Sequence, residues 1–103
     1  MLQLSIAESL ARLARDNKDF VRLIEQTGFD IGLYRPELVD AQSPHARDEI
    51  YVVAAGSGKF VCDGERSAFV TGDVFFVAAG SDHRFERFTP DFCAWVIFIG
   101  KRP

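Results

Sequence analysis

From residue 48 to residue 99 the chain consists of short hydrophobic runs in which the side chains alternate in character. In the run DEIYVVAA, Glu49, Tyr51 and Val53 would lie on one face of an extended chain, and the residues between them on the other. Alternation with a period of two predicts β-strands with a preferred buried face. The pattern therefore predicts a β-rich body.

Turn signals separate these runs at regular intervals. The pair Asp63-Gly64 is typical of a tight hairpin, because a type I′ turn needs positive φ at both central residues. Several short strands joined in this way predict a sandwich or barrel. The other signals are GSG at 56–58, TGD at 71–73, AGSD at 79–82 and TPD at 89–91.

The N-terminal part has a helical pattern. Ser5 and Glu8 have the spacing of a capping box, and hydrophobic residues follow at helical intervals. We therefore expect a helical lead over about residues 4–16 and a β body over about residues 19–100. Both belong to one predicted domain, residues 1–103.

Residues 19–25 leave two alternatives open. Their hydrophobic side chains fit a helix that ends at Gly28, but they also fit a strand. Residues 29–35 alternate with the strand period and predict a strand more clearly. We favour a strand for both segments.

Composition and charge narrow the class of protein. With 103 residues, 48% of them hydrophobic and 26% charged, the chain fits one globular domain with one core. A net charge of -3 and the lack of a basic stripe argue against nucleic acid or an anionic membrane as a partner. No apolar run approaches the roughly 20 residues of a membrane span, and no secretory signal pattern begins the chain, so we expect a cytoplasmic protein.

The two cysteines, Cys62 and Cys93, show no paired spacing. We expect free thiols packed as small hydrophobic side chains.

Glu49 raises the question of candidate chemistry. It shares the predicted inward face with Tyr51, and an isolated buried carboxylate needs a cationic or hydrogen-bonding partner. The chain has two histidines, His45 and His83, which could join Glu49 as a 2-His-1-carboxylate metal site. Spacing alone leaves an alternative open. In it His45 is a loop residue, His83 caps a turn, and Glu49 forms an ion pair with an arginine.

At these residues the chain resembles the cupin superfamily. SPHARDEIYVVAAGSGKF (43–60) is similar to the first cupin motif, H-x-H-x-x-x-E followed by a strand and a glycine. GDVFFVAAGSDHRF (72–85) is similar to the second, a G-D strand that leads to P-x-G-x-x-H. The resemblance implies a mainly β, double-stranded β-helix or jelly-roll barrel that commonly forms a homodimer. It also implies a divalent metal (Fe, Mn, Ni or Zn) held by His45, Glu49 and His83.

The chain departs from the cupin pattern at two places. Ser43 stands where the first motif histidine is usual, so an oxygen of Gln42 or Ser43 would have to complete the coordination. In the second motif Ala78 replaces the usual proline, and Arg87 stands near the position of a common asparagine.

Three residues are candidates for the lining of a substrate pocket. Tyr51 lies two residues after Glu49, and the period of two carries the inward face from His83 to Phe85 and Arg87. The alternative for Phe85 is core packing. For Arg87 it is an ion pair with a protein acid rather than with an anionic ligand.

Open metal positions suit dioxygen activation at iron(II), or polarisation of a carbonyl in isomerisation or hydrolysis. We therefore expect a metal-dependent enzyme, an oxygenase or isomerase, that acts on a small organic molecule, an anionic one if Arg87 lines the pocket. The alternative is a non-catalytic module that binds or senses a small molecule, which the missing motif histidine keeps open.

Overall fold

The computed structural model describes residues 1–40 and 42–102, in which one helix precedes eight strands. The helix is α1 (Ile6–Asp16). The strands are β1 (Phe20–Glu25), β2 (Phe29–Tyr34), β3 (Asp48–Ala55), β4 (Gly58–Cys62), β5 (Glu65–Phe69), β6 (Val74–Val77), β7 (His83–Glu86) and β8 (Cys93–Ile99).

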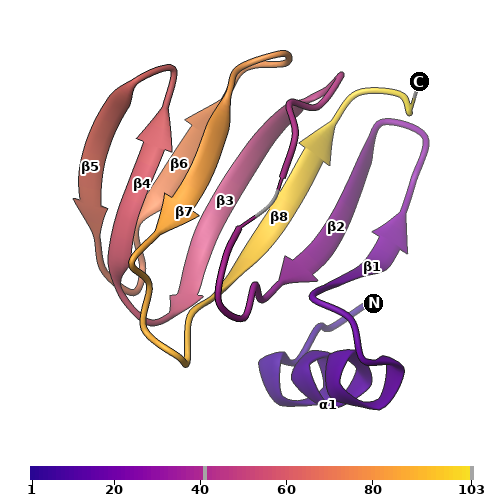
Figure 1. Cartoon of the computed structure of the whole chain (residues 1–103). Coiled ribbons are helices and arrows are strands. Elements are labelled where there is room, and N and C mark those ends of the chain that lie inside the picture. Colours follow the sequence, from indigo (N-terminus) through magenta and orange to yellow (C-terminus); the bar gives the residue numbers. More distant parts are fainter. Residues whose placement is uncertain (41, 103) are drawn as a thin grey trace.

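The strands form two antiparallel sheets that face each other (Figure 1). One sheet has the order β1-β2-β8-β3-β6 and the other the order β5-β4-β7. Apart from the β1–β2 and β4–β5 hairpins, neighbouring strands are far apart in the sequence, as β3 and β8 are, which is the crossing pattern of a jelly roll. The predicted fold class, a mainly β jelly roll with a short N-terminal helix, is confirmed.

Aromatic side chains fill the space between the sheets. Phe60, Phe69, Phe85 and Phe92 are at most 4% exposed, and the Phe85 ring centroid lies 4.7 Å from those of Phe60 and Phe92. The Phe85–Tyr51 pair is edge-to-face at 5.1 Å. Such offset and edge contacts favour tight packing of aromatic cores.

Helix α1 lies outside the barrel, against β1 and β2 (Figure 1). The Ser5 hydroxyl accepts a hydrogen bond from the Glu8 amide, as the capping pattern predicts. Leu13 packs with Val21, Leu33 and Cys93 in a second, smaller core. Within residues 1–40 and 42–102, no helix is long and apolar enough to cross a membrane.

Two local predictions are confirmed. Residues 20–25 form strand β1, which pairs with β2 as a hairpin, so the helical alternative is wrong. Gly32 permits this pairing because a Cβ atom there would lie 2.5 Å from the Val21 carbonyl oxygen. At the β4–β5 turn, Asp63 and Gly64 have φ values of 49° and 86°, as a type I′ turn requires.

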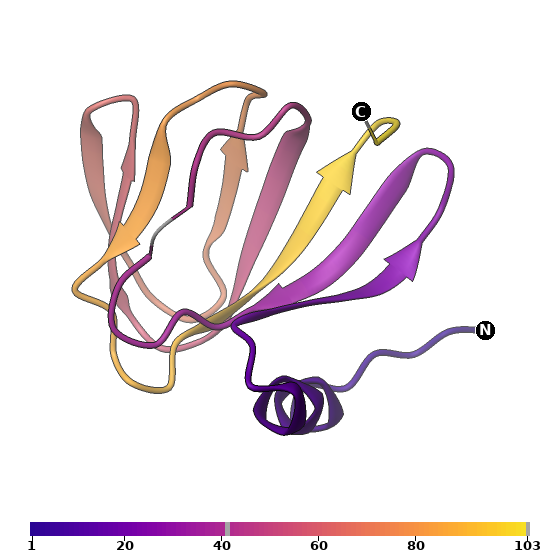
Figure 2. The same ribbon diagram turned by 45° about the vertical axis from the view of Figure 1, so that its right-hand side comes forward.

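The connection between β2 and β3 passes along the opening between the two sheets (Figure 2). Asp40 ties it to both sides, because its carboxylate accepts hydrogen bonds from the Tyr34 hydroxyl on β2 and the Phe85 amide on β7. Farther along, the His45 carbonyl accepts a hydrogen bond from the Gly80 amide. The fold thereby holds His45 beside the ends of β3 and β7.

Candidate metal centre

The three predicted metal ligands come together in the structure. Glu49 lies on β3, His83 begins β7, and His45 lies on the connection before β3. One ligand atom from each lies within 4.8 Å of the others. His45 Nε2 is 3.2 Å from Glu49 Oε1, and His83 Nε2 is 3.1 Å from Glu49 Oε2.

The cluster is buried on one side and open on the other. Glu49 is completely buried and His83 is 2% exposed, whereas the side chain of His45 is 36% exposed. Glu49 points inward together with Tyr51 and Val53, so the predicted inward face of β3 is confirmed. The open side at His45 is where a further ligand could approach.

The hydroxyl of Tyr51 lies in the middle of this cluster. It is 3.1 Å from Glu49 Oε2 and 3.1 Å from His83 Nε2. It also donates to Gln42 Oε1, 2.9 Å away. Burial, followed by the charge of Glu49, raises the pKa of Tyr51, so the phenol stays neutral and has one hydrogen to donate.

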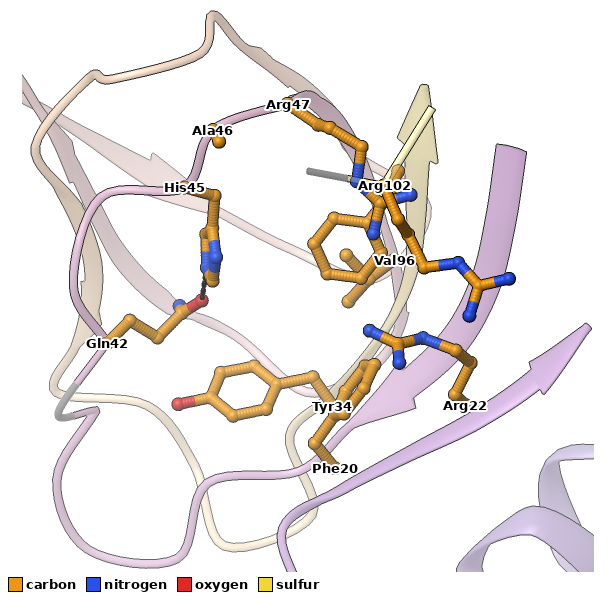
Figure 3. Close-up of a pocket in the computed structure, with 10 residues that line it drawn as sticks. Phe20, Arg22, Tyr34, Gln42, His45, Ala46, Arg47, Val96 and Arg102 are labelled. Carbon is orange, nitrogen blue, oxygen red and sulfur yellow. Dashed lines mark hydrogen bonds between the residues drawn. The ribbon is translucent and has the colours of Figure 1, made fainter. Parts of the chain in front are cut away.

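Gln42 brings a further oxygen to the cluster. Its Nε2 donates to Asp40 Oδ2 at 2.8 Å, which turns its Oε1 toward His45 Nε2, 3.3 Å away (Figure 3). Of the two residues that the sequence offers as a fourth ligand, Gln42 reaches the cluster. Ser43 is exposed, and within residues 1–40 and 42–102 it makes no hydrogen bond to the cluster.

The cluster has more acceptors than hydrogens. The Ser81 carbonyl lies 2.9 Å from His83 Nδ1, which favours the tautomer with the proton on Nδ1 and a lone pair on Nε2. Glu49 Oε1 is buried and lacks a hydrogen-bond partner in the described part of the chain, since its contact with His45 is not aligned as a hydrogen bond. A buried, electron-rich set of this kind is suited to a cation, so the residues fit a divalent metal.

Burial lowers the pKa of His83, but the hydrogen bonds that its ring donates to Glu49 and to the Ser81 carbonyl, with the charge of Glu49, outweigh burial and raise the pKa above 6.5. In metal-free protein the protonated form therefore stabilises the fold. That contribution is complete below about pH 6.5 and is lost as pH rises through the raised pKa.

We expect the free energy of unfolding of chelator-treated protein to fall as pH rises from about 6.5 through the raised pKa of His83. Urea denaturation over this range measures the change. The His83→Gln variant, which cannot take up the proton, should show a flatter profile. The same slope in both proteins would contradict the role of His83.

A cavity of about 530 Å³ opens beside His45 and Gln42. This volume falls within the usual range for small-molecule sites. Phe20, Tyr34, Val96 and Phe98 form its apolar wall. Its remaining lining residues are Arg22, Gln42, His45, Ala46, Arg47 and Arg102 (Figure 3).

The predicted pocket residues lie elsewhere. Phe85, 1% exposed, belongs to the aromatic core, and Tyr51 contacts Glu49 and His83 without lining the cavity. The prediction that Arg87 faces the pocket is wrong. Strand β7 ends at Glu86, and Arg87 is exposed with a φ of 49°, so the period of two no longer holds there.

The cationic part of the cavity wall comes from residues that the sequence did not single out. Arg22, Arg47 and Arg102 surround the buried carboxylate of Asp30. They lie on β1, before β3 and after β8, and sheet pairing alone brings them together. Asp30 gave no signal in the sequence, because it alternates with the apolar residues Phe29 and Ile31; its complete burial appears only in the structure.

Comparison with known proteins identifies the family. Residues 34–99, well over half of the chain, match the family described as "Cupin domain". The chain belongs to the cupin family. An uncharacterized protein of Streptomyces coelicolor is 29% identical to this cupin over 90 residues, which cover 85% of the chain and 86% of the relative.

Solved structures share the fold. KdgF from a Halomonas species superposes with a TM-score of 0.70 at 20% identity, and covers 81% of this cupin and 78% of its own chain. A Cupin 2 conserved barrel domain protein from Salinispora arenicola has a TM-score of 0.65 at 23% identity, with coverage of 78% and 73%. At these identities the likeness concerns the barrel alone.

Proposed function

We propose that this cupin is a metal-dependent enzyme in which His45, Glu49 and His83 hold a divalent transition metal. The observation that carries the proposal is the buried, acceptor-rich cluster, with its ligand atoms within 4.8 Å of one another and Glu49 Oε1 unpaired within the described residues. Two imidazoles and one carboxylate leave coordination positions for a further ligand. Gln42 Oε1 would supply a fourth protein ligand.

The chemistry would take place where the cluster meets the cavity. A bound metal would supply Lewis-acid catalysis, or redox chemistry with dioxygen if it is iron. The chain itself orients the ligands: the Ser81 carbonyl fixes the His83 ring and Asp40 fixes the Gln42 amide. A small organic molecule in the 530 Å³ cavity would lie next to His45, the exposed member of the set.

A second candidate is a non-catalytic cupin that binds a small molecule without a metal. Tyr51 favours it, because its hydroxyl already contacts both Glu49 and His83. Ser43, in place of the first motif histidine, also weakens a metal site. Metal content and turnover separate the two candidates.

Metal analysis of purified protein tests the proposal. We expect about one divalent ion per chain, and its loss in His83→Ala, because the variant removes one of only two imidazole ligands. Glu49→Gln should reduce metal affinity by tenfold or more, whereas Glu65→Gln, which removes one negative charge from an exposed strand, should retain the metal. Equal metal content in all four proteins would contradict the proposal.

The homodimer stays a prediction. Strand β6 is an edge of the five-stranded sheet, and its Val74 and Phe76 are 61% and 62% exposed. An exposed apolar edge of this kind would be the natural contact between two copies.

A further inference from the structure

We propose that the arginines of the cavity form an anion subsite, and that the molecule bound by this cupin is a small organic anion with a carboxylate or phosphate group. The inference rests on the proposed function, because it places that group at one end of the cavity and the rest of the molecule beside His45. Figure 3 shows Arg22 and Arg102 across the pocket from His45 and Gln42.

The charge of the cavity wall supports an anionic ligand. Three of its lining residues are arginines, and none of those in the described part of the chain is acidic. Two carboxylates lie behind them: Asp30, and Glu25, which pairs with Arg102 at 3.1 Å. At this end of the cavity, three positive charges stand against two negative ones, which leaves an excess of one positive charge.

Asp30 holds the three guanidinium groups together. Its side chain is completely buried, and burial alone would raise its pKa. The hydrogen bond from Arg47 and the charges of Arg102 and Arg22 outweigh burial and lower the pKa, so Asp30 is ionised near neutral pH. The negative charge of Asp30 offsets the repulsion among the three guanidinium groups and so holds them close together.

The arginines divide into one that is fixed and two with free donors. Arg47 Nη1 donates to Asp30 Oδ2 at 2.9 Å, and its guanidinium lies 4.8 Å from the centre of the Phe98 ring. Arg22 Nε and Arg102 Nε lie 3.5 and 3.6 Å from the same oxygen. These longer contacts leave donors of Arg22 and Arg102 free to turn toward a ligand.

Arg22 has a donor that the described residues leave unpaired. Its Nε is buried and makes no aligned hydrogen bond, although it lies 3.5 Å from Asp30 Oδ2, while the side chain as a whole is 35% exposed and so can reach the cavity. An unsatisfied buried donor is costly, and a carboxylate or phosphate oxygen would satisfy it. Guanidinium groups bind both kinds of anion through paired hydrogen bonds.

Titration of the protein with inorganic phosphate and with succinate tests the subsite. The titrations use chelator-treated protein, so that neither anion can bind through a metal. We expect saturable shifts of the Arg22 and Arg102 Nε–H signals in NMR spectra, and matching heats in calorimetry. The anion with the higher affinity indicates whether the natural group is a phosphate or a carboxylate.

Variants locate the binding. Arg22→Gln and Arg102→Gln should each weaken it about tenfold or more, because hydrogen bonds to charged groups are lost. Arg22→Lys should recover only part of the affinity, since an ammonium group cannot make the paired contact. Arg87→Gln, which removes the same charge from an exposed position outside the cavity, should have no effect.

Two results would overturn the inference. One is the absence of saturable binding of both anions to unmodified protein. The other is anion binding that needs the metal and is unchanged in Arg22→Gln and Arg102→Gln. Metal content decides the proposed function separately, because the arginines are not among the metal ligands.

Discussion

Removal of the metal is expected to lower the melting temperature of this cupin by about 10 °C or more. A ligand present at about 100 times its Kd adds about 2.7 kcal/mol to the free energy of unfolding. For a domain of about 100 residues, each kcal/mol shifts the melting temperature by about 4–8 °C. Thermal unfolding with added metal and with chelator measures the difference.

The physical reason is the buried carboxylate of Glu49. Without a cation, its Oε1 stays desolvated and unpaired among the described residues. His83→Ala serves as the control, and its melting temperature should not depend on chelator. Equal melting temperatures of the unmodified protein with and without chelator would favour the metal-free binding module.

Replacement of Phe85 by alanine is expected to cost about 3–5 kcal/mol. The ring is 1% exposed and lies within 6.4 Å, centroid to centroid, of four phenylalanine rings and of Tyr51. Since small domains are stable by only about 5–15 kcal/mol, the variant should be close to unfolding at room temperature. Chemical denaturation monitored by fluorescence gives the value.

Phe85→Leu is the matched control, because it retains most of the volume and should cost less than about 1.5 kcal/mol. A Phe85→Ala variant as stable as the unmodified protein would contradict the assignment of Phe85 to the core and return it to the pocket wall.

Much of the fold follows from local patterns. The alternation in residues 48–55 predicts the buried face of β3, and Asp63-Gly64 predicts the β4–β5 hairpin. Residues 19–25 were ambiguous because their apolar positions fit both periods. Their strand conformation is decided by pairing with β2, where Gly32 leaves room for the Phe20 ring.

The candidate site could also be predicted in part from the sequence. His45, Glu49 and His83 lie in two segments that resemble cupin motifs in order and spacing, and this resemblance predicted that the three side chains share one site. Gln42 was one of two alternatives, and only Asp40 turns its amide oxygen inward. The prediction for Arg87 was wrong because it extended the strand period one residue beyond the end of β7.

The arginine cluster could not be predicted in this way. Arg22, Arg47 and Arg102 come from three distant segments and meet because β1 pairs with β2, β2 with β8, and β8 with β3. Each is unremarkable in the sequence, where an isolated arginine usually lies on a solvated surface. The partner that gathers them, Asp30, is identified by its complete burial, which only the folded chain shows.

The most direct test of the metal centre is a crystal structure of the purified protein with diffraction data at the absorption edge of the bound metal. We predict one anomalous peak per chain, bonded to Nε2 of His45, Nε2 of His83 and a carboxylate oxygen of Glu49, with metal–nitrogen distances of about 2.0–2.1 Å if the metal is zinc. The account would be contradicted if crystals of protein produced with added metal showed no anomalous peak among these atoms, and Tyr51 were hydrogen-bonded to Glu49 and His83 instead.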